Sequence, residues 1–131
     1  MNEPLTNVAL VKHAKKMGIA RFRGVYTKDS LPAVRRPEEC GIVNLQDSKG
    51  PGTHWVTYYT RGQCALYFDS FGLPPPKEVK AYLGGQRIIV NQRRIQKSEE
   101  VVCGQYCLFV LYHLSKGANF FDIVNKLHEG Q

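Results

Sequence analysis

Apolar positions near the amino terminus recur at helical spacing. They follow one side of residues 6–17, and the set comprises Val8, Val11, Ala14 and Met17. The other side carries Lys12, Lys15 and Lys16. Thr6 or Asn7 can cap the first turn of this segment, and Gly18 can end its last turn. The pattern predicts an amphipathic helix with its lysines in solvent.

Short apolar runs separated by turn residues come next, and they predict strands. A short strand is expected near Gly24–Tyr26, and longer ones at Gly41–Gln46, His54–Tyr59, Cys64–Phe68 and Gln86–Asn91. The linker Asp47–Gly52 and the Arg61-Gly62 turn separate the middle runs in the way that hairpins require.

The run CGQYCLFVLYHLS, from Cys103 to Ser115, is the most informative segment. Every residue from Cys107 to Tyr112 is apolar or aromatic, so a helix here would be buried on nearly all sides. The stretch PPPKEVKAYLGG predicts a proline-started helix ending at Gly84–Gly85, and Phe120–Leu127 predicts a last amphipathic helix. The whole order predicts one α+β domain over residues 1–131. In this domain we expect a single, mostly antiparallel sheet that packs on a central buried helix with flanking helices.

Composition narrows the class of protein further. The 131 residues are 43% apolar and 22% charged, as in ordinary globular domains. No apolar stretch reaches the roughly 20 residues of a membrane span, and the amino terminus lacks a secretory pattern. We therefore expect an intracellular or virion-packaged protein that is not secreted and has no membrane partner. The four cysteines need not form disulfides, and Cys40 and Cys64 are expected to be small core residues.

The formal net charge of +7, with an isoelectric point near 9.4, adds a partner hypothesis. The basic excess is concentrated in the first 36 residues, and a second group comes late: Arg87, Arg93, Arg94 and Lys97. Such a surface either binds polyanions, nucleic acid included, or is simply solvated. Both interpretations stay open from the sequence.

Cys103 is the first candidate for chemistry. It lies where the polar stretch QKSEE gives way to the buried helix, so its thiol is expected at a helix N-terminus. The macrodipole and unpaired N–H groups there favour the reactive thiolate. Cys107 lies one turn deeper and should be buried and inert. Two core cysteines would be the structural alternative.

A general base is needed to take the thiol proton, and His54 fits that role. His54 opens a strand after a glycine-rich turn, and Asp69 ends the next strand. If the two strands form a hairpin, these side chains are neighbours despite their separation, and the carboxylate can orient the imidazole. Each residue alone is also compatible with a structural role.

Gln96, seven residues before Cys103, is a candidate oxyanion donor together with the Cys103 backbone N–H. A loop glutamine by itself carries no such meaning. A zinc site built from Cys103, Cys107, His113 and His54 is the other alternative, but the helix supplies no second pair at zinc-finger spacing.

Taken together, these residues resemble the adenovirus-type cysteine endopeptidases and, more distantly, the ubiquitin-like-protein-specific proteases. The runs that carry the resemblance are GIVNL leading to GTHW, LYFDSFG and VCGQYCLFVLYHL, with Gln96 before the last. The amino-terminal runs LTNVALVKHAKKMG and FRGVYTKDSLP also match, so the resemblance covers about residues 5–115.

The resemblance implies a papain-like fold and a cysteine endopeptidase with His54, Asp69 and Cys103 as catalytic residues and Gln96 in the oxyanion hole. It implies a narrow groove, with Trp55 near the cleavage point, that accepts glycine before the scissile bond. Precursor proteins with Gly-Gly or Gly-X-Gly-like sites, as in virion maturation, would be the substrates.

A deconjugase for a ubiquitin-like modifier and a non-catalytic nucleic-acid-binding module are the alternatives. No metal or other cofactor is required by this scheme, and DNA is a candidate activator. A monomer acting in the host cell, the nucleus included, or inside a virion is expected. The resemblance departs from the adenoviral pattern at Asp69, where the mammalian adenoviral enzymes have glutamate. The sequence also offers no cysteine suited to the disulfide by which the adenoviral enzymes hold an activating peptide.

Overall fold

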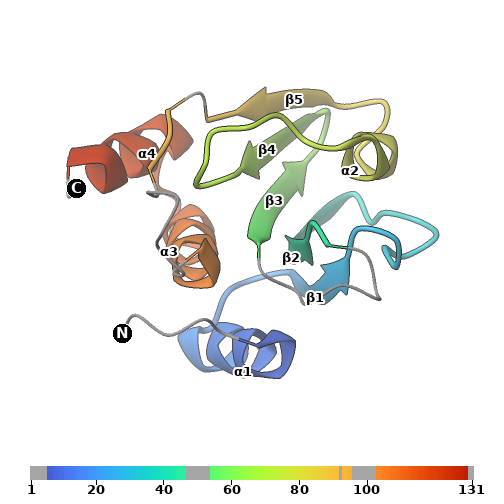
Figure 1. Cartoon of the computed structure of the whole chain (residues 1–131), viewed down its shortest axis with the longest axis horizontal. Helices are drawn as coiled ribbons and strands as arrows, with labels where there is room; N and C mark the ends of the chain where they lie inside the picture. The colour runs from blue at the N-terminus through green and yellow to red at the C-terminus, as the bar shows by residue number, and fades with distance from the viewer. Residues whose placement is uncertain (1–5, 47–53, 92, 96–102, 130–131) are drawn as a thin grey trace.

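The chain folds into one five-stranded sheet with helices on both faces (Figure 1). The computed structural model describes residues 6–46, 54–91, 93–95 and 103–129. The helices are α1 (Asn7–Met17), α2 (Lys77–Tyr82), α3 (Cys103–Ser115) and α4 (Phe120–Glu129). The strands are β1 (Phe22–Thr27), β2 (Glu38–Asn44), β3 (Trp55–Arg61), β4 (Cys64–Phe68) and β5 (Arg87–Val90).

The strand order in the sheet follows the chain, from β1 to β5. The central pairs β2–β3 and β3–β4 are antiparallel, whereas the outer pairs β1–β2 and β4–β5 are parallel. The predicted α+β class is confirmed, with a mixed sheet rather than a mostly antiparallel one. The outer pairs are parallel because their connections cross over and return the chain in the same direction, and α2 forms one of these crossovers.

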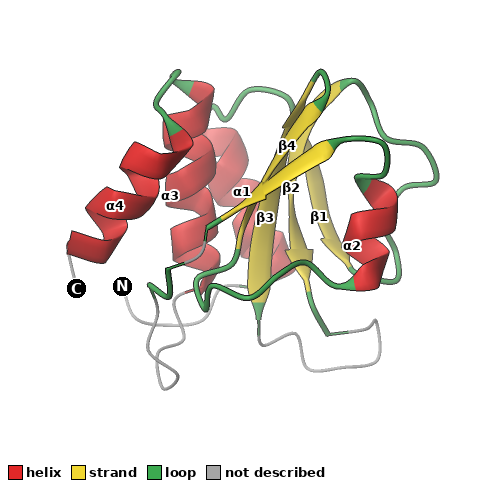
Figure 2. Cartoon of the chain, turned by 90° about the horizontal axis from the view of Figure 1, so that it is seen from above, coloured by secondary structure: helices red, strands yellow, loops and turns green. Residues whose placement is uncertain are grey.

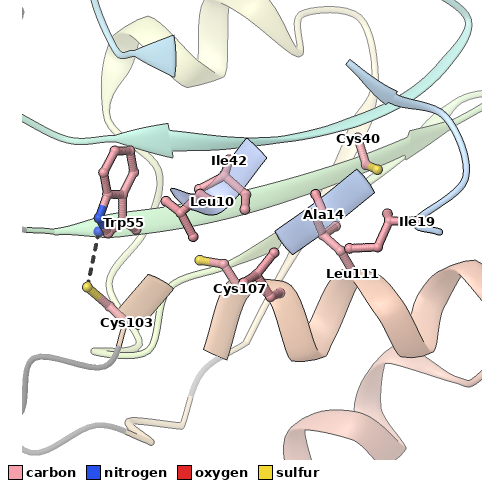
Figure 3. Packing of buried hydrophobic residues seen from close by; sticks show 10 residues of the cluster. Leu10, Ala14, Ile19, Cys40, Ile42, Trp55, Cys103, Cys107 and Leu111 are labelled. Atoms are coloured by element: carbon pink, nitrogen blue, oxygen red, sulfur yellow. Dashed lines mark hydrogen bonds between the residues drawn. The ribbon is translucent and has the colours of Figure 1, made fainter. Parts of the chain in front are cut away.

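Three helices, α1, α3 and α4, lie on one face of the sheet, and α2 lies on the other (Figure 2). α3 is the buried helix that the apolar run predicts. It begins at Cys103, and Cys107 and Leu111 face Leu10 and Ala14 of α1 (Figure 3). Helix α3 packs on β3 and lies between α1 and α4 in the same layer, which fixes the position of its N-terminus (Figure 2).

Helix α1 begins and ends where its capping residues predict. The Thr6 hydroxyl accepts a hydrogen bond from the backbone N–H three residues later, and Gly18 adopts the left-handed conformation that ends the helix. The side of the helix that the apolar spacing predicted to be buried is only partly correct. Leu10 and Ala14 are fully buried, whereas Val8 is 72% exposed. The tertiary contact with α3, and not the apolar count alone, decides which side of the helix faces the core.

The α2 face of the sheet encloses a polar cluster around Glu39, whose side chain is fully buried. Glu39 accepts hydrogen bonds from Arg23 at 3.0 Å, from the Tyr82 hydroxyl at 2.7 Å and from the Tyr58 hydroxyl. Burial raises the pKa of this carboxyl, but the hydrogen bonds outweigh burial and lower it below its ordinary value of 4.5. The cluster ties β1, β2, β3 and α2 together.

Within the part of the chain that the structure describes, no helix is both long enough and apolar enough to cross a membrane.

Candidate active site

Cys103 occupies the first position of α3 and is 3% exposed. Its sulfur accepts a hydrogen bond from the backbone N–H of Trp55 at 3.3 Å (Figure 3). Cys107 is fully buried, and burial, then the nearby Cys103 and Asp69 charges, raise the pKa of its thiol well above the ordinary value. The two cysteines are therefore unequal: Cys107 lies in the core as a neutral thiol, and Cys103 meets a backbone donor at a helix N-terminus.

The β3–β4 hairpin brings His54 and Asp69 together. Thr57 pairs with Phe68, so the start of β3 lies beside the end of β4. The His54 Nε2 and Asp69 Oδ1 atoms are 2.8 Å apart, and their side chains are 16% and 0% exposed. The two residues are 15 positions apart in the chain, and the hairpin expected from the two apolar runs brings them together.

The electrostatics of the site favour a charged imidazole. Burial lowers the pKa of His54, but hydrogen bonds and charge from Asp69 and Cys103 outweigh burial and raise it from 6.5 to about 9. Because Nε2 is held by Asp69, Nδ1 is the nitrogen left to exchange a proton with the Cys103 thiol. His54, Asp69 and Cys103 thus form one coupled group, assembled from the starts of β3 and α3 and the end of β4.

Asn91 is a residue of this site that the sequence analysis missed. It follows β5 and is buried, and its side chain bonds both backbone groups of Asp69. Its Oδ1 accepts from the Asp69 N–H at 2.9 Å, and its Nδ2 donates to the Asp69 carbonyl at 2.7 Å. Nδ2 also donates to the Arg93 carbonyl at 3.0 Å. An asparagine that ends an apolar strand was the available signal, but its partner became clear only with the β4–β5 pairing.

The other predicted residues are placed as follows. Trp55 is 6% exposed and packs in the cluster with Leu10, Ile42 and Cys103, and its backbone N–H is what meets the sulfur. Gln96 lies outside the described residues. Among the residues that the structure describes, no group of three or more His, Cys, Asp or Glu side chains is arranged to hold a metal ion.

Comparison with known proteins agrees with this architecture. No protein-family model matches the chain. A cysteine protease of African swine fever virus is 33% identical over 99 residues, covering 60% of this chain and 35% of the viral protein. A crystal structure of a protease from that virus superposes with a TM-score of 0.67 at 18% identity, covering 98% of this chain and 66% of the other.

The fold of this chain matches that of the African swine fever virus protease. A second crystal structure of the African swine fever virus protease gives a TM-score of 0.54 at 22% identity, over 71% of this chain and 42% of that one. HopZ1a, solved with IP6 and CoA, also gives 0.54, at 15% identity over 93% of this chain and 45% of that one.

The chain spans about a third of the curated viral relative, since the match covers 35% of that protein. The matches support a relation to a viral cysteine protease and do not single out the adenoviral enzymes. The adenovirus-type assignment stays a prediction from the sequence motifs.

Proposed function

We propose that this protein is a cysteine endopeptidase with Cys103 as nucleophile, His54 as general base and acid, and Asp69 as the residue that orients His54. The observation that carries the proposal is the convergence of the three side chains. The imidazole bonds Asp69 at 2.8 Å, and the raised pKa of His54 depends on both Asp69 and Cys103. Likeness to a viral cysteine protease supports the same conclusion.

The reaction is acyl transfer. The Cys103 thiol gives its proton to His54 Nδ1, and the thiolate attacks the carbonyl carbon of the scissile peptide. The oxyanion that forms is expected to accept hydrogen bonds from the Cys103 backbone N–H and the Gln96 amide. The imidazolium protonates the leaving amine as the C–N bond breaks. His54 then takes a proton from water, which attacks the thioester and releases the acid and the thiol.

Cleavage after glycine at Gly-Gly or Gly-X-Gly-like sites is the proposed specificity, with viral or virus-like structural precursors as substrates. This part rests on the resemblance of GTHW, LYFDSFG and VCGQYCLFVLYHL to the adenovirus-type enzymes, with Trp55 near the cleavage point. A deconjugase is the second candidate within the same chemistry. It would require a folded modifier, whereas an endopeptidase cleaves short Gly-Gly peptides, so comparing the two substrate types separates them.

The nucleophile assignment is tested with a Gly-Gly peptide library and two matched variants. Cys103→Ala should abolish cleavage, and Cys107→Ser should retain it, because Cys107 is fully buried one turn below the site. Cleavage that survives Cys103→Ala but not Cys107→Ser would refute the assignment. Absence of Cys103 labelling by a cysteine-directed suicide probe, beyond that of denatured protein, would favour a non-catalytic binding module.

DNA is proposed as an activator that binds the basic surface. The exposed lysines of α1 are Lys12, Lys15 and Lys16, and they contribute to the net charge of +7. Peptidase rate should rise with duplex DNA at low salt and lose that rise at high salt, since phosphate contacts release counterions. Replacing the three lysines with glutamine should remove the rise. A rate independent of DNA would assign the charge to solubility. A monomer acting inside the host cell or virion completes the proposal.

A further inference from the structure

An aromatic ring covers the imidazole of the proposed base. Phe71 lies two residues after Asp69, and its ring stacks on the His54 ring with centroids 4.5 Å apart and planes 16° apart. The guanidinium of Arg94, in the segment that follows β5, lies over the same phenyl ring at 4.9 Å from its centroid. The Phe71 ring therefore contacts an imidazole and a guanidinium, two groups that can carry positive charge.

Backbone contacts fix Phe71 relative to the carboxylate. The Phe71 N–H donates to Asp69 Oδ1 at 2.8 Å, the same oxygen that meets His54 Nε2. Gly72, in the left-handed conformation, donates to the Asp69 carbonyl at 2.7 Å. One carboxylate oxygen thus positions the imidazole in its plane and also holds the turn that carries the stacking ring.

The segment that carries Arg94 is held to the same turn. The Ile95 N–H donates to the Ser70 carbonyl at 2.7 Å, and Asn91 links the Asp69 and Arg93 carbonyls. Arg94 is itself exposed, whereas Phe71 is half-buried and His54 is 16% exposed. From solvent inward, the order is guanidinium, phenyl ring and imidazole.

We propose that Phe71 is a positioning residue that holds the His54 imidazole in plane between Asp69 and Cys103, and that Arg94 steadies the Phe71 ring. The proposal rests on the cysteine peptidase function given above. A stacked ring restricts rotation of the imidazole and keeps water from one of its faces. Its electron-rich face also attracts a cation, so it favours the imidazolium that stabilises the thiolate.

Among the described residues, the charged and titratable groups around His54 are Asp69 after β4, Cys103 at the start of α3 and, through the phenyl ring, Arg94. Asp69 and the Cys103 thiolate favour the imidazolium, and Arg94 opposes it by like charge. Loss of the Phe71 ring removes a favourable contact with the cation and leaves that repulsion in place. Loss of the ring should therefore lower the pKa of His54 and slow the reaction of Cys103 at neutral pH.

The test is the pH dependence of Cys103 alkylation by iodoacetamide in the full chain, followed by mass spectrometry of the Cys103 peptide. Phe71→Leu should slow the reaction at neutral pH by about tenfold, the size expected for a partly buried cation–π contact, and move its onset to higher pH. Phe71→Tyr keeps a ring and should restore both. Phe121→Leu is the matched control, because Phe121 lies on α4 and is 54% exposed.

A role in packing alone would lower the thermal midpoint of unfolding of Phe71→Leu and leave the pH onset unchanged, and that result would overturn the inference. The part assigned to Arg94 is tested by a double-mutant cycle. Arg94→Gln should slow alkylation in the parent. It should not slow alkylation in Phe71→Leu, where it removes only the like-charge repulsion. Equal slowing in both backgrounds would refute an action through the ring.

Failure of the two proposals can be told apart. If parental Cys103 reacts no faster than the denatured chain, the proposed peptidase function fails. If parental Cys103 reacts fast and Phe71→Leu matches it at every pH, only the inference about Phe71 fails.

Discussion

Asp69→Asn tests the electrostatic basis of the site with little change in shape. In the parent, Asp69 Oδ1 accepts from both His54 Nε2 and the Phe71 N–H, each at 2.8 Å. The asparagine oxygen can accept the same two bonds. Asp69 Oδ2 is buried with no hydrogen-bond partner among the described residues. The asparagine NH2 group can replace this oxygen without breaking a hydrogen bond. The substitution therefore removes charge and keeps the two contacts.

The size of the effect follows from the pKa of His54. Its rise from 6.5 to about 9 occurs against burial, and it corresponds to roughly 3 kcal/mol in favour of the imidazolium, shared between Asp69 and Cys103. Without the Asp69 charge, burial remains as a force that lowers the pKa. In a Cys103→Ala background, which removes the coupled thiol, Asp69→Asn should lower the pKa of His54 by at least about one unit, or ~1.4 kcal/mol.

The pKa is measured by NMR, from the pH dependence of the His54 ring Cε1–H resonance. Peptidase activity is measured in parallel, with Cys103 intact. Asp69→Asn should lower kcat by roughly 10² to 10⁴, the upper value being that of the same change in a serine protease triad. An unchanged His54 midpoint in Asp69→Asn would refute the assignment of the raised pKa to this carboxylate.

The same shift makes stability depend on pH. A group whose pKa is raised on folding contributes stability that is complete below its unfolded pKa and is lost as pH rises through its folded pKa. The free energy of unfolding should therefore fall between pH 6.5 and about 9 in the parent. Urea titrations at several pH values in that window give the free energy of unfolding at each pH. This free energy should fall less steeply with pH in Asp69→Asn than in the parent.

Three further substitutions test the supporting structure. Asn91→Leu should slow peptide cleavage by about tenfold or more while His54 still titrates, because the amide that bonds both backbone groups of Asp69 is lost; wild-type rates would argue against this role. Gly72→Ala should lower the thermal midpoint of unfolding, because Gly72 has a φ of +72° and an added Cβ would lie 3.1 Å from the Arg93 carbonyl carbon. An unchanged midpoint would contradict the tight turn. Glu39→Ala should lower the free energy of unfolding, measured with urea at neutral pH, by about 3 kcal/mol, because a half-buried guanidinium and two tyrosine hydroxyls lose their acceptor. A change near zero would show that the cluster is not needed for stability.

The sequence alone predicted most of the helices and strands and the residues proposed for chemistry. Local signals act over a few residues, and they were sufficient for β4 at Cys64–Phe68, for the caps of α1 and for the start of α3 at Cys103. Alternating apolar runs and a tight turn imply a hairpin, and a hairpin places its two open ends together. The meeting of His54 and Asp69 was therefore expected if the two strands form a hairpin, and the structure contains that hairpin.

The tertiary structure decided what depends on contacts between distant segments. The parallel pairing of β5 with β4 brings Asn91 to Asp69, and no local pattern encodes which strand an edge strand joins. The packing of α1 against α3 buried Leu10 and left Val8 in solvent, although both residues are apolar. The stack of Phe71 on His54 depends on a turn closed by hydrogen bonds to Asp69. Periodicity indicates which side chains are buried, whereas the residues that they contact are decided only when the helices pack on the sheet.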